Sequence, residues 1–378
     1  MKEITIITIS GILAILLIGL FSGCMILEAA PNYTTTLPFP PGNYANRASD
    51  AVLNNPNIEG VLLSARWRNI ETSKGKYNWS ALDNKINTIA KARKKVVLNV
   101  MTCGVNVPDW IINDPEVETF EFLDVMKHHP TYNKSFKAPV YWDEKYLSEK
   151  QKFINKLGKR YANNPAVVGV MISFVGTFTN DWYIPRDKYK KGDSLAEQEL
   201  LNRGYSTDRM FEVGKRTIDM WAKAFPTQAL KLPIGKSIPD SNNTMTSLAE
   251  RIINYAYSKY PNRFYAQINA LSTIIPKANS PKVQNAPPHR IYYFFKLLSQ
   301  HPRHIGFQMT SSVTKYPTRV DNAGICPVSD SKCIMGKTIE TALTYEPYFI
   351  EYWYEDIENP ELQDILRDVS AILKKVKR

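Results

Sequence analysis

Cysteine and histidine are scarce in this sequence: its 378 residues include four cysteines and five histidines. A structural metal site usually gathers several such ligands at short spacing. Cys326 and Cys333 have no histidine or cysteine pair nearby, and the adjacent residues His128 and His129 cannot easily share one ion. We therefore expect no metal site, and no cofactor is indicated.

Acidic residues are in the minority, with 36 Asp plus Glu against 48 Lys plus Arg and a net charge of +12. Such a surplus favours anionic surfaces or acidic glycans as partners. The basic residues are scattered, and their densest runs, 91–95 and 374–378, fall on expected helices or the tail. A solvated face explains them better. No segment has the pattern of a nucleic-acid-binding module, so we expect no nucleic-acid partner.

Few polar residues interrupt segment 4–20, which is followed by Phe21, Ser22, Gly23 and Cys24. Small residues before a cysteine, after an apolar run, are typical of a lipoprotein signal peptide. We expect residues 1–23 to be that peptide, Cys24 to carry lipid at a membrane, and residues 24–31 to be a tether. The alternative is an uncleaved single-pass anchor. Either arrangement predicts that residues 32–378 lie outside the cytoplasm.

A short polar loop joins Cys326 to Cys333. In an oxidising compartment this spacing predicts a local disulfide. Cys103 is then expected to be a free, buried thiol.

Short apolar runs alternate with amphipathic helical patterns along most of the chain, and there is no repeat or low-complexity segment. This alternation is typical of a parallel α/β fold. Eight strands are expected, at 33–37, 60–66, 96–102, 167–173, 229–235, 264–270, 304–310 and 348–353. Residues 32–378 are therefore predicted to form one α/β domain, a (β/α)₈ TIM barrel with a long insertion, 104–142, after strand three.

Segment 60–83 combines the second strand, a turn and the start of a helix. It contains Trp67, Ile70, Glu71, Gly75, Tyr77, Trp79 and Asp83. The spacing of these residues resembles a signature of clan-A glycoside hydrolases, notably the family 42 β-galactosidases, with a threonine at position 72 where the family has proline. Segments 161–170 and 349–362 also resemble that clan. The resemblance implies a barrel that acts on carbohydrate.

Alternate side chains of a barrel strand face the lumen, so polar residues inside strands mark that side. Buried polar groups are unfavourable unless they pair with each other or with a ligand. We expect a ligand site where these residues converge; the alternative is an internal network with Arg66 and Glu351 as a buried ion pair. The polar residues so marked are Ser64, Arg66, Asn99, Ser173, Gln267, Asn269, Gln308, Thr310 and Glu351. Of these, Arg66, Asn99, Asn269 and Gln308 are the expected substrate ligands.

Tryptophans fall at expected strand ends or in the loops there. Flat apolar rings stack on sugar faces, and the indole N–H adds a donor. We expect them to ring the mouth of the barrel and bind carbohydrate. These residues are Trp67, Trp110, Trp142, Trp182 and Trp353, all but Trp142 being assigned to the substrate site.

Most glycoside hydrolases need two carboxylates, and the resemblance implies glutamates at the ends of strands four and seven. Neither expected strand end has one. Three explanations remain open. The pair has moved, with Asp181 as the acid and Glu351 as base or nucleophile; the protein is a non-catalytic glycan-binding surface lipoprotein; or the expected registers of strands four and seven are wrong.

Overall fold

A computed structural model describes residues 39–125, 129–185, 195–241 and 243–375. The expected signal peptide, Cys24, the tether and the segment 33–37 lie outside the described residues. None of the helices in the described ranges combines the length and hydropathy needed to span a bilayer.

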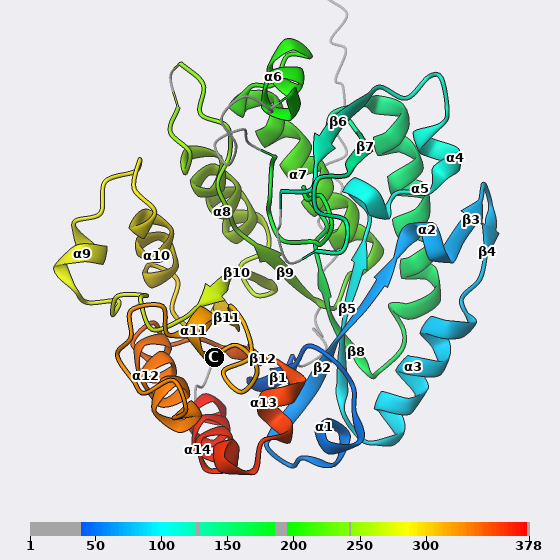
Figure 1. The fold of residues 1–378 in the computed structure, drawn as a ribbon. Coiled ribbons are helices and arrows are strands. Elements are labelled where there is room, and N and C mark those ends of the chain that lie inside the picture. The colour runs from blue at the N-terminus through cyan, green and yellow to red at the C-terminus, as the bar shows by residue number, and fades with distance from the viewer. Residues whose placement is uncertain (1–38, 126–128, 186–194, 242, 376–378) are drawn as a thin grey trace, which may run out of the picture. The chain divides into compact units, whose positions relative to one another are not determined.

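Eight parallel strands close into a barrel within the described residues, and the helices lie around it (Figure 1). This confirms the predicted (β/α)₈ fold. The order around the barrel is β1-β12-β11-β10-β9-β8-β5-β2. The bounds are β1 (Gly42–Ala45), β2 (Ile58–Arg66), β5 (Lys95–Met101), β8 (Val167–Met171), β9 (Ala229–Pro233), β10 (Phe264–Leu271), β11 (Ile305–Met309) and β12 (Phe349–Tyr352).

Seven of the expected strands coincide with barrel strands. The expected first strand, 33–37, does not: the first strand of the barrel is β1, which pairs with both β12 and β2. The α-helices are α1 (Asp50–Asn54), α2 (Trp67–Ile70), α3 (Ser80–Lys91), α4 (Asp109–Ile112), α5 (Glu144–Tyr161), α6 (Leu195–Asn202), α7 (Thr207–Ala224), α8 (Ser247–Lys259), α9 (Pro281–Gln284), α10 (Tyr292–Ser299), α11 (Pro317–Val320), α12 (Ser331–Leu343), α13 (Tyr354–Glu358) and α14 (Gln363–Lys374).

The expected insertion after the third barrel strand is present. It contains a short 3₁₀ turn (Gly104–Asn106), α4, and an antiparallel hairpin of β6 (Thr119–Leu123) and β7 (Ser135–Pro139). A second small hairpin, β3 (Glu71–Ser73) with β4 (Lys76–Tyr77), follows α2. Both hairpins come after the carboxyl end of a barrel strand, where loops of this fold build sites.

Two apolar layers hold the barrel together. The outer layer packs the strands against the helices, and includes α5 residues such as Phe153 and Leu157. The inner layer fills the amino-terminal half of the lumen with aromatic rings, among them Phe39, Tyr44 and Phe349. At Gly306 an added Cβ would lie 2.0 Å from the Phe349 ring, so only glycine leaves room for that ring. The lumen is therefore closed at one end and polar toward the other.

The predicted disulfide between Cys326 and Cys333 is present, and Cys103 is free and buried as expected. The adjoining helix, α12, begins at Ser331, where the Asp330 side chain accepts a hydrogen bond from the Cys333 N–H and caps the helix. The disulfide therefore ties a loop to the first turn of α12.

Candidate functional site

An ion pair occupies the interior of the barrel. The Lys231 ammonium of β9 contacts the Glu351 carboxylate of β12, and both side chains are 0% exposed. Gln267 of β10 and Gln308 of β11 donate hydrogen bonds to Glu351 Oε2 at 2.8 and 3.2 Å. Burial lowers the pKa of Lys231, and the nearby Glu351 charge opposes that shift. The partner of Glu351 is thus Lys231 and not Arg66, which corrects the expected alternative pairing.

A chain of amides connects this ion pair to the barrel mouth. Gln267 Nε2 also donates to Asn269 Oδ1 at 2.6 Å, and Asn269 Nδ2 donates to the Asp181 carboxylate. Asp181 is exposed, and Thr179 Oγ1 donates a second hydrogen bond to it at 2.9 Å. The two carboxylates singled out in the sequence therefore lie at opposite ends of one hydrogen-bond chain, one exposed and one buried.

A second chain holds the residue before Asp181. Asn180, 2% exposed, donates to Asn99 Oδ1 at 2.7 Å, and Asn99 donates to Ser64 Oγ at 3.0 Å. These contacts confirm that Ser64 and Asn99 share the lumen side of β2 and β5. The loop that carries Asp181 is therefore held by hydrogen bonds to two different strands: Asp181 to Asn269 of β10, and Asn180 to Asn99 of β5.

Backbone contacts brace the same loop. The Val105 N–H donates to the Thr177 carbonyl at 2.9 Å, and the Thr102 N–H donates to Ser173 Oγ at 2.9 Å. Gly104 has φ +59°, and an added Cβ there would lie 2.0 Å from the Thr177 oxygen. A side chain at position 104 would therefore displace the loop.

Arg66 lies at the end of β2 in the same phase as Ser64, and its side chain is exposed. Its side chain makes no hydrogen bond or ion pair to another described residue. A cation at a barrel mouth that forms no internal contact is available to a ligand. Its assignment as a substrate ligand stays a prediction.

The tryptophans do not form one ring at the mouth, and that expectation is wrong. Trp67 is 0% exposed and stacks on Phe153 of α5, with ring centroids 4.9 Å apart. Its Nε1 donates to Glu71 Oε2 at 2.7 Å, and Trp110 lies edge-on to it at 6.4 Å. Trp67 follows lumen-facing Arg66, so the strand alternation turns it outward beneath the helices. It cannot stack on a sugar in this position.

The other indoles lie in separate places. Trp142 is half-buried and stands under the Arg209 guanidinium, 5.5 Å from its ring centre. Trp353 is half-buried and donates from Nε1 to the Met309 carbonyl at 2.9 Å. Trp182 is 6% exposed and packs edge-on against Phe174 at 4.8 Å. Trp353, after β12, and Trp182, beside Asp181, remain close to strand ends that face the mouth.

The registers of the fourth and seventh barrel strands agree with the sequence prediction, so a wrong register does not explain the missing glutamates. Gln308 pairs with Glu351 across β11 and β12, and Met309 ends β11. Ser173 follows β8 and accepts from the Thr102 N–H. Among the described residues, neither strand end presents a glutamate.

Sequence reasoning missed Lys231. It is the charged residue of β9, Ala-Leu-Lys-Leu-Pro, and the alternation of that strand places it in the lumen phase. The same alternation had identified Glu351, so the signal was available. The pairing itself depends on a contact between strands 120 residues apart.

A second buried lysine lies behind the Asp181 loop. Lys150 of α5 is 1% exposed and donates to the Ser173 carbonyl at 2.7 Å. Burial lowers its pKa to about 8. Burial also raises the pKa of the neighbouring Cys103 thiol, which disfavours the thiolate. This pair is therefore part of the packing, not an activated nucleophile.

A pocket of about 260 Å³ lies beside Asp181. The ends of β9 and β10 and the start of α10 form its walls, which are mostly apolar. Its lining residues are Asp181, Trp182, Pro233, Ile234, Gly235, Lys236, Ile268, Asn269, Ala270, Ile291, Phe294 and Phe295.

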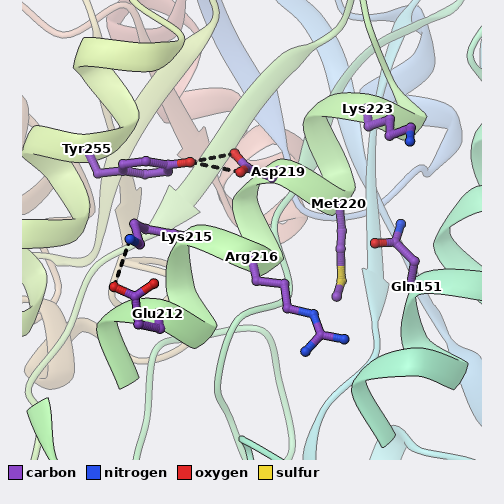
Figure 2. Close-up of a pocket in the computed structure, with 8 residues that line it drawn as sticks. All are labelled: Gln151, Glu212, Lys215, Arg216, Asp219, Met220, Lys223 and Tyr255. Carbon is purple, nitrogen blue, oxygen red and sulfur yellow. Dashed lines mark hydrogen bonds and ion pairs between the residues drawn. The ribbon is translucent and has the colours of Figure 1, made fainter. Parts of the chain in front are cut away.

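Another hollow lies on the outside of the barrel, among α5, α7 and α8 (Figure 2). Several of its charged groups have partners within the protein: Lys215 pairs with Glu212 at 2.7 Å, and Asp219 accepts a hydrogen bond from the Tyr255 hydroxyl at 2.8 Å. Sites in barrels of this type lie at the carboxyl ends of the strands. We therefore place the candidate site at Asp181. No group of three or more metal-ligating side chains occurs in the described ranges.

Comparisons with known proteins agree with the resemblance seen in segment 60–83. A glycoside hydrolase family 42 model, described as β-galactosidase, matches residues 52–181, roughly a third of the 378 residues. No curated protein matches the chain.

Two solved structures show the same fold. A β-galactosidase from Rahnella sp. R3 is 13% identical with a TM-score of 0.51, over 90% of this chain and 58% of that one. The catalytic domain of a β-amylase from Paenibacillus polymyxa is 10% identical with a TM-score of 0.52, over 89% of this chain and 98% of that one. The matched region thus spans 58% of the Rahnella enzyme, and 43% of a β-galactosidase from the psychrophile Marinomonas ef1.

Proposed function

We propose that the protein is a glycoside hydrolase in which Asp181 is the catalytic acid. The observation that carries this proposal is the placement of Asp181: it is an exposed carboxyl at the mouth, held by Asn269 and Thr179 and bordering a pocket. The family 42 match, which covers the segment ending at Asp181, supports carbohydrate as the substrate.

Glu351 does not fit the role of base or nucleophile. Its side chain is 0% exposed, and its oxygens are occupied by Lys231, Gln267 and Gln308. A nucleophile has to reach the anomeric carbon. We assign Glu351 as a positioning residue, which orients Gln267 and, through it, Asn269 and Asp181.

With Asp181 as the acid, the reaction can proceed on one face of the sugar. Asp181 donates its proton to the leaving oxygen as the glycosidic C–O bond breaks, and the leaving alcohol departs. A water molecule then enters from the same side, adds to the anomeric carbon, and returns a proton to Asp181. Atoms balance, with one water consumed and Asp181 regenerated, and the anomeric configuration is retained.

The experiment is hydrolysis of a broad glycoside panel by wild type, Asp181→Asn and the control Asp368→Asn, an exposed residue of α14. General acid catalysis contributes about 10² to 10⁴ in rate. We expect a loss of that order for Asp181→Asn, none for Asp368→Asn, and a first product of retained configuration by proton NMR. Unchanged hydrolysis by Asp181→Asn would refute the assignment.

The second candidate function is carbohydrate binding without turnover. The lack of a glutamate at the described ends of β8 and β11, together with the buried state of Glu351, favours it. Calorimetric binding of glycans to wild type, with no hydrolysis across the panel, would establish this candidate over the first.

We further propose that the protein acts outside the cytoplasm, anchored to a membrane through its amino terminus. The support is the small-residue motif before Cys24 and the Cys326–Cys333 disulfide, a bond typical of oxidising compartments. Metabolic labelling with a radioactive fatty acid should mark wild type and not Cys24→Ala. Equal labelling of both would contradict lipidation at this residue.

A further inference from the structure

The pocket beside Asp181 differs in chemistry from the rest of the mouth. One end presents the Asp181 carboxylate and the Asn269 amide, which are hydrogen-bonded to each other. Apart from Lys236, the remaining walls are mostly apolar: Ile234 follows β9, Ile268 belongs to β10, and Phe294 and Phe295 belong to α10. The other polar groups, Asn99 and Arg66, belong to β5 and β2, on the far side of β8 in the barrel order.

Apolar side chains remain accessible at the rim of this pocket. Ile291, which precedes α10, is 47% exposed, and Ala270, at the end of β10, is exposed as well. Phe294 and Phe295 are 5% and 6% exposed and form a floor that is already packed. The apolar surface left uncovered at the rim is what a ligand would bury.

The size of the pocket limits the ligand. Pockets for drug-sized molecules measure about 300 to 1,000 Å³. This one, about 260 Å³, suits a single ring and its substituents.

We infer that the pocket is the leaving-group site and that the substrate is a glycoside of a flat apolar alcohol, such as a phenol. This inference rests on the proposed function. The acid touches the oxygen that joins sugar to leaving group, so the two parts of the substrate lie on different sides of Asp181. The polar groups of β2 and β5 suit the sugar hydroxyls, and the carbon-lined pocket suits the ring.

Calorimetry with two thioglycosides, which resist hydrolysis, tests this inference without turnover. The probes are phenyl thio-β-D-galactoside and methyl thio-β-D-galactoside, chosen because the matching family model is that of β-galactosidases. Burial of the additional carbon surface should make the phenyl probe bind wild type about tenfold tighter than the methyl probe.

Three variants locate the effect. Ala270→Phe fills the pocket and should abolish the preference for the phenyl probe, measured as the ratio of the two dissociation constants. Ile291→Ser should reduce that preference about threefold, because it removes apolar surface from the rim. Ile274→Ser is the matched control: Ile274 is 50% exposed in the same β10–α10 connection but does not line the pocket, and the preference should be unchanged.

The inference is overturned if wild type binds the phenyl probe no tighter than the methyl probe, or if Ala270→Phe leaves the preference intact. Failure of the proposed function looks different: phenyl preference would depend on Ala270 and Ile291, while Asp181→Asn had no effect on hydrolysis or no hydrolysis occurred at all.

Discussion

Lys231 and Glu351 form an ion pair that no solvent reaches, at the centre of a barrel whose amino-terminal half is filled with aromatic rings. Two buried charges are stable together only when their remaining hydrogen-bonding capacity is met. Gln267 and Gln308 meet it for Glu351, and the Phe349 ring lies 3.9 Å from the Lys231 ammonium. The pair therefore links the packed half of the lumen to its polar half.

Breaking this pair from one side should be costly. Lys231→Met leaves the Glu351 charge buried without its partner, so we expect the free energy of unfolding to fall by about 3 to 5 kcal/mol. Lys231→Met combined with Glu351→Met should be more stable than the single variant. Urea denaturation measures both. The exposed pair Lys277–Glu340 supplies a control, since Lys277→Met should change little. Equal effects of Lys231→Met and Lys277→Met would contradict the role given to the pair.

Trp67 and Arg66 are adjacent but should affect different properties. Trp67→Phe loses the hydrogen bond to Glu71, which is itself 3% exposed, and should reduce the free energy of unfolding by about 2 kcal/mol. It should leave glycan affinity as it is. Arg66→Ala should do the reverse, weakening glycan binding without loss of stability. Denaturation and calorimetry on the same two variants check the assignment, and a weaker glycan affinity in Trp67→Phe would show that its ring is a ligand after all.

Lys150 makes stability depend on pH in the alkaline range. Burial lowers its pKa from 10.5 to about 8 in the folded protein, so between these values the unfolded chain binds more protons. The free energy of unfolding therefore rises with pH in this window. Below pH 8 the folded protein carries the full cost of burying the Lys150 charge, and above the unfolded pKa of 10.5 that cost is absent because the lysine is neutral in both states. From pH 7 to 10, wild type should gain about 2 kcal/mol relative to Lys150→Met. Parallel pH dependence of the two proteins would contradict this account.

The alternation of strand residues predicted the polar interior well. It identified Gln267, Asn269, Gln308 and Glu351, because period-two geometry assigns a face to each residue of a strand. The alternation could not predict which of these side chains contact one another, because those contacts depend on the order and stagger of the strands around the barrel. The ion pair with Lys231 and the amide chain to Asp181 became visible only with that arrangement.

Prediction failed where local sequence carried little pattern. β1 has four residues, Gly-Asn-Tyr-Ala, and its polar Asn43 is buried because its amide donates to the Leu366 and Asn57 carbonyls. The sequence of this strand has no alternation of polar and apolar residues that would indicate the burial of Asn43. The tryptophans were misjudged for another reason: a position near a strand end does not specify direction, and Trp67 lies one residue beyond a lumen-facing arginine.

The role of Asp181 as proton donor at the barrel mouth can be measured by comparing two leaving groups in wild type and Asp181→Asn. The dinitrophenolate of a dinitrophenyl glycoside can leave without being protonated, whereas the alcohol of an alkyl glycoside of the same sugar must be protonated as it leaves. We expect Asp181→Asn to slow hydrolysis of the alkyl glycoside by at least about 10² and of the dinitrophenyl glycoside by much less. An equal loss for both substrates, or no loss for either, would contradict it.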